Sequence, residues 1–317
     1  MRSIPIIFAI DNNMVMQCGV TITSLLMNVK ADTFYDVYII CNQSQLMDEN
    51  KSVLQQAFAS EKQCKITFVD VGEAFKESEG LAEGHITTAT YFRLAIPALF
   101  PQFDKAIYAD VDMIFQQDLS ELYQSSLQNG ELVAAVLDLA IDDKYYFKSG
   151  LPARIGKSEK DYFNAGFLVM NLEQMRKAEV QKELSRHAKI KYEMNDQDVL
   201  NIVCNDKVQL LPSVYNFQPS HFANFLWGKD KCAISFGSLF KRATLHYTGR
   251  FKPWNSLECV ASDTWWHYYK MSPFYDDIVY FRRQYDQIES HKNDFRVKSN
   301  GQLLTRIMVN IKHKLFG

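Results

Sequence analysis

The sequence predicts an α/β protein with a layered, parallel sheet, and three observations support this fold class. Short apolar runs rich in β-branched residues indicate buried strands. Segments with apolar residues at helical spacing lie between the early runs, which gives the order β-α-β-α-β. With 317 residues, of which 47% are hydrophobic and 23% charged, the chain can bury a large core in one sizeable domain or two small ones.

The first part of the chain supplies five predicted strands and the helices between them. The strands cover residues 4–10, 35–41, 65–69, 105–109 and 132–137. The helices cover residues 20–27, 47–58 and 87–99, the last with Thr-rich start signals. Ligands of such sheets bind beyond the carboxyl ends of the strands, where Asp11-Asn12-Asn13 and Asp110-Val111-Asp112 both fall. We therefore expect these two polar groups to line one crevice.

The second part of the chain continues with shorter elements and no internal repeat. A strand is predicted over residues 165–170, a charged helix over residues 172–189, and an apolar helix that opens at Asn195-Asp196-Gln197-Asp198. Asn195 or Asp196 is, on the simplest interpretation, the N-cap of that helix. A short strand follows over residues 243–247, and aromatic residues from Trp265 to Tyr275 indicate a helix that packs against the main domain.

Asp110 and Asp112 stand one residue apart at the end of a predicted strand. Side chains alternate between the two faces of an extended chain, so both carboxylates would face the same side. Two like charges that converge in this way usually bind a divalent cation. The alternative is a strand that runs into a solvated turn, with the Asp residues as loop formers, and the short D-x-D motif alone does not decide between them.

Charge and cysteine content limit the possible partners and compartments. Lys and Arg number 35 against 37 Asp and Glu, and the formal charge of -2 lacks the basic excess typical of nucleic-acid binding. The six cysteines form no C-x-x-C pair, so they suggest neither a zinc knuckle nor a redox motif. Neither a signal peptide nor a bilayer-spanning stretch is recognisable. We expect a cytoplasmic protein without a nucleic-acid partner.

Residues 291–317 form a basic segment with a helical pattern. Six basic residues face one acidic residue there, which gives a local charge of +5. Apolar residues from Leu303 to Leu315 fall on one helical stripe, with most of the basic residues outside it. Such a helix can lie on an anionic membrane surface, or it can dock on the domain as an ordinary C-terminal helix. The pattern supports both interpretations equally.

Three motifs occur together in a fixed order: the D-x-D of Asp110 and Asp112, Phe163-Asn164-Ala165-Gly166, and H-Y-x-G-x-x-K-P-W from His246 to Trp254. On these motifs the chain resembles glycosyltransferase family 8, over residues 4 to about 254. That family holds retaining enzymes that move a hexose from a UDP-sugar, including bacterial lipopolysaccharide galactosyl- and glucosyltransferases and glycogenin. Several spaced motifs are more specific than any one of them.

The resemblance implies a more detailed fold. It implies a single Rossmann-like domain of the nucleotide-sugar transferase type A kind, with a mixed, mostly parallel sheet and a helical C-terminal region. We expect a catalytic, nucleotide-sugar-binding domain over residues 1–255. An aromatic helical extension over residues 256–290 and a basic amphipathic tail over residues 291–317 would follow it.

The resemblance also implies a metal site and a nucleotide site. Asp110, Asp112 and His246 would hold Mn²⁺, with Mg²⁺ as a poorer substitute, since oxygen ligands plus one imidazole suit these ions. Gly249 would let the backbone approach the diphosphate closely, and Lys252 would supply a point charge for it. Asp11 and Asn13 would bind uracil and ribose, with backbone contacts from Ala9. The alternative for this last group is a polar turn after the first strand. Met14 departs from the family pattern, in which an aromatic residue often stacks on uracil.

The positions that match the family's donor-sugar site are Arg93, Asp138, Asn164, Asp196 and Gln197. Arg93 could instead be a surface charge, Asp138 a loop residue and Asn164 part of a tight turn. Asp196 and Gln197 could instead cap a helix. Ala165 and Gly166 would leave room for the sugar ring. Gln197 would lie near the anomeric carbon, and because an amide is a poor nucleophile, the resemblance implies front-face substitution through an oxocarbenium-like state rather than a covalent intermediate.

The function implied is transfer of glucose or galactose from UDP-glucose or UDP-galactose to a glycan or lipid-linked saccharide, in lipopolysaccharide or another surface polysaccharide. The protein would then work in the cytoplasm, with possible peripheral contact to the inner face of the membrane through residues 291–317. A metal-dependent nucleotidyltransferase is an alternative that would release pyrophosphate from an NTP. A non-catalytic nucleotide-sugar-binding protein is another. A nicotinamide enzyme fits less well, since no G-x-G-x-x-G follows the first strand.

Overall fold

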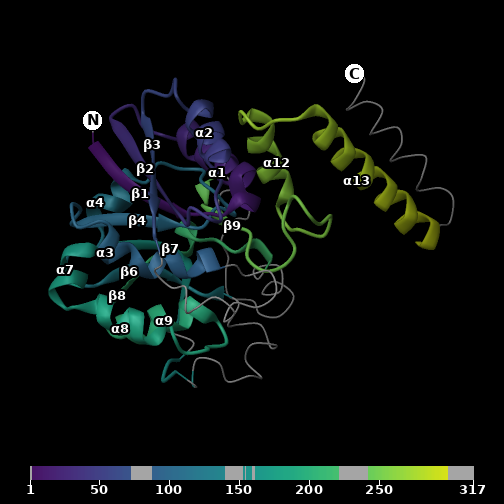
Figure 1. Ribbon diagram of the computed structural model, residues 1–317. Helices are drawn as coiled ribbons and strands as arrows, with labels where there is room; N and C mark the ends of the chain where they lie inside the picture. Colours follow the sequence, from purple (N-terminus) through teal and green to yellow (C-terminus); the bar gives the residue numbers. More distant parts are fainter. Residues whose placement is uncertain are drawn as a thin grey trace. The chain divides into compact units, whose positions relative to one another are not determined.

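The computed structural model describes residues 2–72, 88–139, 153, 155–158, 161–220 and 242–298. The chain divides into two compact units, Met1–Phe274 and Tyr275–Gly317. All described strands belong to the first unit, which therefore carries the sheet (Figure 1). The predicted domain boundaries at residues 255 and 290 do not coincide with this division and stay predictions about how the chain folds.

A mixed sheet of seven strands forms the centre of the first unit, as the family resemblance implies. Its strand order is β3-β2-β1-β4-β7-β6-β8. The pairs β2–β3, β1–β2, β1–β4 and β6–β8 are parallel, whereas β7 is antiparallel to both β4 and β6. The strands are β1 (Arg2–Ala9), β2 (Thr33–Cys41), β3 (Cys64–Asp70), β4 (Lys105–Ala109), β6 (Val133–Leu137), β7 (Phe163–Asn171) and β8 (Val208–Leu210).

The five strands predicted in the first part of the chain are confirmed. The predicted helix over residues 47–58 is confirmed as α2 (Asp48–Ala57), while α1 (Val15–Met27) begins earlier than the predicted residue 20. Of the predicted helix over residues 87–99, the described part is a 3-10 helix, η3 (Thr88–Ala95), that leads into the short α3 (Ile96–Leu99), and residue 87 lies outside the described residues.

Three predictions about the elements are wrong in detail. The single helix over residues 172–189 is two helices, α7 (Leu172–Lys177) and α8 (Val180–His187), because Glu179 between them adopts a left-handed conformation with a φ of 51°. The strand over residues 243–247 is reduced to β9 (Leu245–His246). It pairs with β5 (Met113–Ile114) in a separate two-stranded antiparallel sheet.

The third correction concerns the D-x-D segment, which is not part of a strand. Strand β4 ends at Ala109 and β5 begins at Met113, so Asp110 and Asp112 lie in the turn between them. The alternation of an extended chain therefore does not explain why their carboxylates converge. Helix α1 contributes to this turn instead: the Thr21 hydroxyl lies 2.8 Å and 2.9 Å from the carbonyl oxygens of Val111 and Met113.

Helices cover both faces of the sheet, because successive strand residues point to opposite sides. Ile6 and Phe8 of β1 pack into one apolar cluster with α1, α2 and α4 (Ser120–Ser125). Ile7 of the same strand packs into a second cluster with η3, α3, α7, α8 and α9 (Asn195–Cys204). The layered α/β architecture predicted from the sequence is therefore present (Figure 1).

The aromatic stretch after residue 254 packs in the core, as predicted. Helix α12 (Ser262–Met271) carries Trp265, whose ring stacks on Tyr269 at 5.4 Å between centroids and lies 5.3 Å from Trp254. The indole N–H of Trp266 donates to the Pro253 carbonyl. Helix α12 thus fixes the loop that follows β9. Phe274 lies beyond the end of this helix rather than within it.

The remaining described elements are short, apart from one long helix. The 3-10 helices η1 (Asn12–Met14) and η5 (Ser213–Tyr215) follow β1 and β8, and α13 (Asp277–Lys298) belongs to the second unit. Most of the predicted amphipathic segment, from residue 299 on, lies outside the described residues. Within the described part of the chain, no helix is both long enough and apolar enough to cross a bilayer. Cys18, Cys41, Cys64 and Cys204 are buried, free thiols, and Cys259 is buried as well.

Candidate active site

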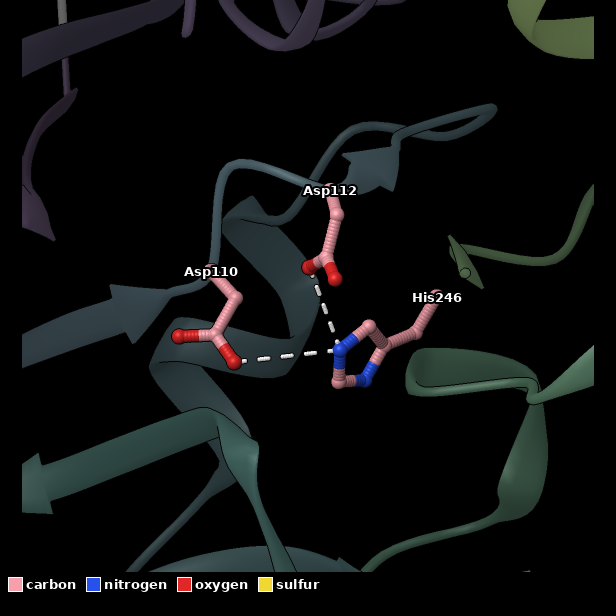
Figure 2. A group of neighbouring side chains, drawn as sticks. All are labelled: Asp110, Asp112 and His246. Atoms are coloured by element: carbon pink, nitrogen blue, oxygen red, sulfur yellow. Dashed lines mark ion pairs between the residues drawn. The ribbon is translucent and has the colours of Figure 1, made fainter. Parts of the chain in front are cut away.

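Asp110, Asp112 and His246 converge on one point although they come from distant parts of the sequence (Figure 2). The Nε2 atom of His246 lies 3.2 Å from Oδ1 of Asp112 and 3.7 Å from Oδ2 of Asp110. The antiparallel pairing of Met113 with His246 brings the β4–β5 turn against β9. One potential ligand atom from each of the three side chains lies within 4.8 Å of the others.

This cluster fits a divalent cation. Oδ1 of Asp112 is buried and faces only Nε2 of His246, 3.2 Å away, so an electropositive ligand between these two atoms would compensate its desolvation. Two carboxylate oxygens and one imidazole nitrogen are a donor set suited to Mn²⁺ and, less well, to Mg²⁺. The alternative of a solvated turn therefore does not describe Asp112.

Gly166 on β7 leaves the space that these side chains occupy. A Cβ atom at this position would lie 2.2 Å from Cε1 of His246 and 2.8 Å from Oδ2 of Asp110. The peptide N–H of Asp110 donates to the Gly166 carbonyl oxygen at 2.8 Å, which brings the two backbones together. The absence of a side chain at this position thus makes room for the predicted metal ligands, a role that the sequence did not suggest.

Lys252 lies beside the same cluster. Its Nζ atom is 2.5 Å from Oδ2 of Asp112 and 2.6 Å from the Tyr247 carbonyl oxygen. Burial alone raises the pKa of the Asp112 carboxyl, but the Lys252 ammonium and the His246 imidazole outweigh burial and hold that pKa well below its usual range. Asp112 is therefore ionised and ready to bind a cation. Gly249, in the same loop, has a φ of 78°, a left-handed conformation that favours glycine.

Arg93 is buried, so the interpretation of this residue as a surface charge is wrong. Only 5% of the residue is exposed. Its Nη2 lies 3.1 Å from Oδ1 of Asp110, its Nε lies 2.8 Å from Oδ2 of Asp196, and its Nη1 donates to the Ala165 carbonyl at 2.6 Å. One guanidinium thus joins a predicted metal ligand to the predicted sugar site.

Asp196 is the most strongly perturbed carboxyl of the predicted sugar site. Burial, opposed by Arg93 and reinforced by Asp110, raises its pKa to about 7. The geometry explains why Arg93 does not cancel the effect of burial. The Nε–H of Arg93 donates to the Thr90 carbonyl at 3.0 Å, so Oδ2 of Asp196 lies close to Nε without a hydrogen bond to it.

The remaining predicted sugar-site residues form one buried network. The Gln197 side chain donates from Nε2 to Oδ2 of Asp138 at 2.7 Å, and its Oε1 accepts from the Ala165 peptide N–H at 3.0 Å. Asn164 donates to the same Asp138 oxygen at 3.3 Å. Met194, not Asn195 or Asp196, occupies the N-cap position of α9, and it makes no side-chain cap bond, so the helix-cap interpretation is wrong.

The predicted nucleotide residues lie at the carboxyl end of β1, beside β4. Oδ1 of Asp11 accepts a hydrogen bond from the Asn13 peptide N–H at 2.8 Å and so caps η1. Asp11 is buried, Ala9 is partly exposed and Asn13 is exposed. The alternative of a polar turn describes this local geometry correctly, and nucleotide binding by these residues stays a prediction. Met14 packs against the core from a partly buried position.

Tyr108, Tyr162 and Asn216 support the site and were not predicted. Tyr108 donates to Oδ1 of Asp110 at 2.7 Å. Tyr162 lies 3.2 Å from Nε2 of Gln197, and Asn216 lies 2.9 Å from Nδ1 of His246. Each of them stands outside any motif and is brought to the site by the fold, so no pattern in the sequence marks it.

The sheet order, with carboxylates at the carboxyl end of its central strands and a histidine brought against them, fits the type A fold class of nucleotide-sugar-dependent glycosyltransferases. The chain belongs to glycosyl transferase family 8, whose family model matches residues 5–258.

Similar proteins agree with this assignment. A putative glycosyltransferase of Haemophilus influenzae is 28% identical over 307 residues, covering 89% of this chain and 88% of that protein. The lipopolysaccharide 1,2-glucosyltransferase of Escherichia coli strain K12 is 27% identical over 301 residues, covering 89% of this chain and 84% of that protein. The galactosyltransferase LgtC, solved with donor and acceptor sugar analogues, has the same fold, with a TM-score of 0.69 at 22% identity over 86% of this chain and 98% of that one.

Proposed function

We propose that this glycosyltransferase moves glucose or galactose from a UDP-sugar to a glycan acceptor, with retention at the anomeric carbon and with a divalent cation bound by Asp110, Asp112 and His246. The convergence of these three side chains is the observation that carries the proposal. A bound Mn²⁺ or Mg²⁺ would offset the charge of the diphosphate and so stabilise it as a leaving group.

Lys252 is proposed to act on the same diphosphate. Its ammonium is held at Asp112, beside the metal ligands, and can serve the phosphate oxygens once a cation has neutralised that carboxylate. Gly249 gives the loop the turn that brings Lys252 there. Ala9, Asp11 and Asn13 are proposed to contact the uridine, because they lie at the carboxyl end of β1, at the edge of the sheet where ligands of this fold class bind.

The network beyond the metal site is proposed to hold the hexose. Both ends of the Gln197 amide are engaged, by Asp138 and by the Ala165 peptide, and this orients the side chain without making it a nucleophile. This favours front-face substitution over a covalent intermediate. The ionised Asp196 carboxylate would stabilise positive charge on the sugar, and Arg93 and Asn164 would keep the network in place.

The acceptor is proposed to be a saccharide of a surface polysaccharide, free or lipid-linked. The support is the name of the Escherichia coli relative, a lipopolysaccharide glucosyltransferase that the chain matches over most of its length. On this proposal the protein works in the cytoplasm, where residues 291–317 contact the inner face of the membrane.

The proposal is tested by UDP release from UDP-glucose and UDP-galactose in the presence of Mn²⁺. We expect Asp110→Ala and Asp112→Ala to abolish nearly all turnover and Gln197→Ala to slow it moderately. Asp48→Ala, which removes a carboxylate that is 80% exposed, is the matched control and should behave like the unsubstituted protein. Normal metal-dependent turnover in the Asp112 variant would contradict the metal assignment. Release of pyrophosphate from an NTP would favour a nucleotidyltransferase, and binding of UDP-hexose without turnover would favour a non-catalytic protein.

A further inference from the structure

We propose that Asn216 is a positioning residue of the metal centre, which holds the His246 imidazole with Nε2 toward Asp110 and Asp112. This inference rests on the metal site of the proposed function and adds to it a residue outside every motif of the sequence. A chain of hydrogen bonds that starts at a backbone amide sets the orientation of the Asn216 amide.

The Gly166 peptide N–H donates to Oδ1 of Asn164 at 2.9 Å. Because a peptide N–H can only donate, this bond fixes which end of the Asn164 amide is the oxygen. The Nδ2 atom of Asn216 lies 2.9 Å from the same oxygen and must therefore be the donor. Oδ1 of Asn216 is then the atom that faces His246.

The Nδ1 atom of His246 lies 2.9 Å from Oδ1 of Asn216. An amide oxygen can only accept, so Nδ1 of the imidazole must carry a proton and donate it. Nε2 is then the nitrogen that can offer a lone pair, and it is the one that faces the carboxylates of Asp110 and Asp112. Partners of this kind orient metal-binding histidines and raise their basicity.

Asn216 is well placed to hold the ring rigidly. It is fully buried, and only 3% of His246 is exposed, so neither side chain has water as an alternative partner. Backbone hydrogen bonds pair the two segments on both sides of the contact: the Phe217 N–H donates to the Thr244 carbonyl and the His246 N–H donates to the Phe217 carbonyl, each at 2.8 Å. The distance from Asn216 to the imidazole is thus fixed by the fold.

Asn164 extends the same chain of bonds to the proposed sugar site. It donates to Asp138, which also accepts from Gln197. A single buried network therefore connects the metal ligand His246 with the amide proposed to lie at the anomeric carbon. Asn216 is the side chain that joins its two halves.

Two variants of Asn216 separate orientation of the histidine from simple packing. Asn216→Ala removes the acceptor for the imidazole. Asn216→Asp keeps an acceptor for Nδ1–H but replaces the amide that donates to Asn164. The matched control is Asn201→Ala, which removes another fully buried asparagine that bonds to the Phe163 backbone rather than to His246.

The measurement is the affinity of the full-length protein for Mn²⁺ alone, from the loss of the free-ion electron paramagnetic resonance signal, with thermal unfolding recorded in parallel. We expect Asn216→Ala to weaken Mn²⁺ binding about 10- to 100-fold. Asn216→Asp should bind Mn²⁺ much more tightly than Asn216→Ala, and Asn201→Ala should lose stability without losing Mn²⁺ affinity.

Unchanged Mn²⁺ affinity in Asn216→Ala would overturn the inference, and so would a loss of affinity in all three variants in proportion to their loss of stability. Failure of the unsubstituted protein to bind Mn²⁺ would instead contradict the proposed metal site itself. The two failures are therefore distinguishable in one series of measurements.

Discussion

At the scale of single residues, the buried Arg93 guanidinium determines the charge balance of the site. It lies within ion-pair distance of both Asp110 and Asp196, and its carbon atom lies 4.7 Å from the centre of the Tyr108 ring. Removing one partner of a buried pair leaves an uncompensated charge and is strongly destabilising. Arg93 thus links the ionisation of Asp196 to the stability of the folded protein.

The raised pKa of the Asp196 carboxyl predicts how the free energy of unfolding depends on pH. Its pKa is raised to about 7 in the folded protein, so the folded state holds a proton that the unfolded state has already released. The stabilisation from this proton is full below the ordinary pKa of an aspartate and is lost as the pH rises through about 7. Loss of the ion pair with Arg93 adds a cost that does not change with pH. On top of this cost, we expect the unfolding free energy of Asp196→Asn, which resembles the protonated form, to rise relative to that of the unsubstituted protein by about 3 kcal/mol as the pH increases from 5 to 8.

Urea unfolding of both proteins at a series of pH values measures this difference. A difference in unfolding free energy that stays constant over the whole range would show that Asp196 does not titrate there. The effect of Asp112 on stability has the opposite pH dependence. Because the pKa of Asp112 is lowered in the folded protein, the stability that its ionised form provides is lost as the pH falls.

The close approach of Gly166 to the His246 ring predicts the effect of a side chain at position 166. Gly166→Ala would place a Cβ 2.2 Å from the His246 ring, so the imidazole must move away from the carboxylates. We expect Mn²⁺ affinity to fall by at least about tenfold, because small displacements of catalytic groups have large effects. Gly19→Ala, the same substitution at a crowded position outside the metal site, is the control for loss of stability alone. Equal Mn²⁺ affinity of the Gly166 variant and the control would contradict the prediction.

The sequence predicts the three clustered side chains but not the residues that hydrogen-bond to them, and the reason is physical. Asp110, Asp112 and His246 lie in short motifs that the family resemblance marks. Tyr108 and Asn216 act through one hydrogen bond each, to Asp110 and to His246. Asn216 reaches His246 only through pairing of segments 30 residues apart, which leaves no local pattern. Tyr108 stands two residues before Asp110 and is local, but no motif marks it.

At the scale of elements, α1 and the segment after α12 are held together by an unusually close contact. A Cβ at Gly19 of α1 would lie 2.0 Å from the Phe274 ring. The Asn28 side chain, at the end of α1, also donates to the Tyr268 hydroxyl of α12 at 2.9 Å. Thr21 of the same helix contacts the D-x-D turn through a separate hydrogen bond.

This contact predicts that substitutions at Gly19 and Phe274 have non-additive effects on the free energy of unfolding. Gly19→Ala should destabilise the protein by about 1–3 kcal/mol, because the added methyl group overpacks the contact. In a Phe274→Ala background the methyl group has room, so we expect the same substitution to cost much less. Chemical unfolding of the four proteins of this double-mutant cycle is the measurement. Additive effects would mean that the ring moves aside freely.

Element boundaries are predicted well where the pattern is local and poorly where the fold overrides it. The buried strands β1, β2 and β4 were predicted closely from apolar runs. The break between α7 and α8 was not, because a left-handed Glu179 costs energy that only tertiary packing can compensate. The antiparallel direction of β7 also follows from long-range pairing, which alternation of strands and helices does not encode.

At the scale of the whole molecule, charge is unevenly distributed along the chain. The formal charge of -2 includes the +5 of residues 291–317, so the rest of the chain is net negative. A basic end on an acidic protein favours one orientation at an anionic surface. Such an orientation would suit an enzyme that acts on a lipid-linked acceptor.

This uneven charge predicts how the protein binds to lipid vesicles. The full-length protein should sediment with vesicles of anionic phospholipid, and a truncation before Asn300 should sediment much less, because it loses Arg306, Lys312 and Lys314 together with the apolar stripe. Each basic residue near such a surface contributes about 1 kcal/mol, so binding should weaken at high salt and on zwitterionic vesicles. Unchanged UDP release by the truncated protein is the control for folding. Equal sedimentation of the two proteins would remove the membrane hypothesis and favour a helix docked on the domain.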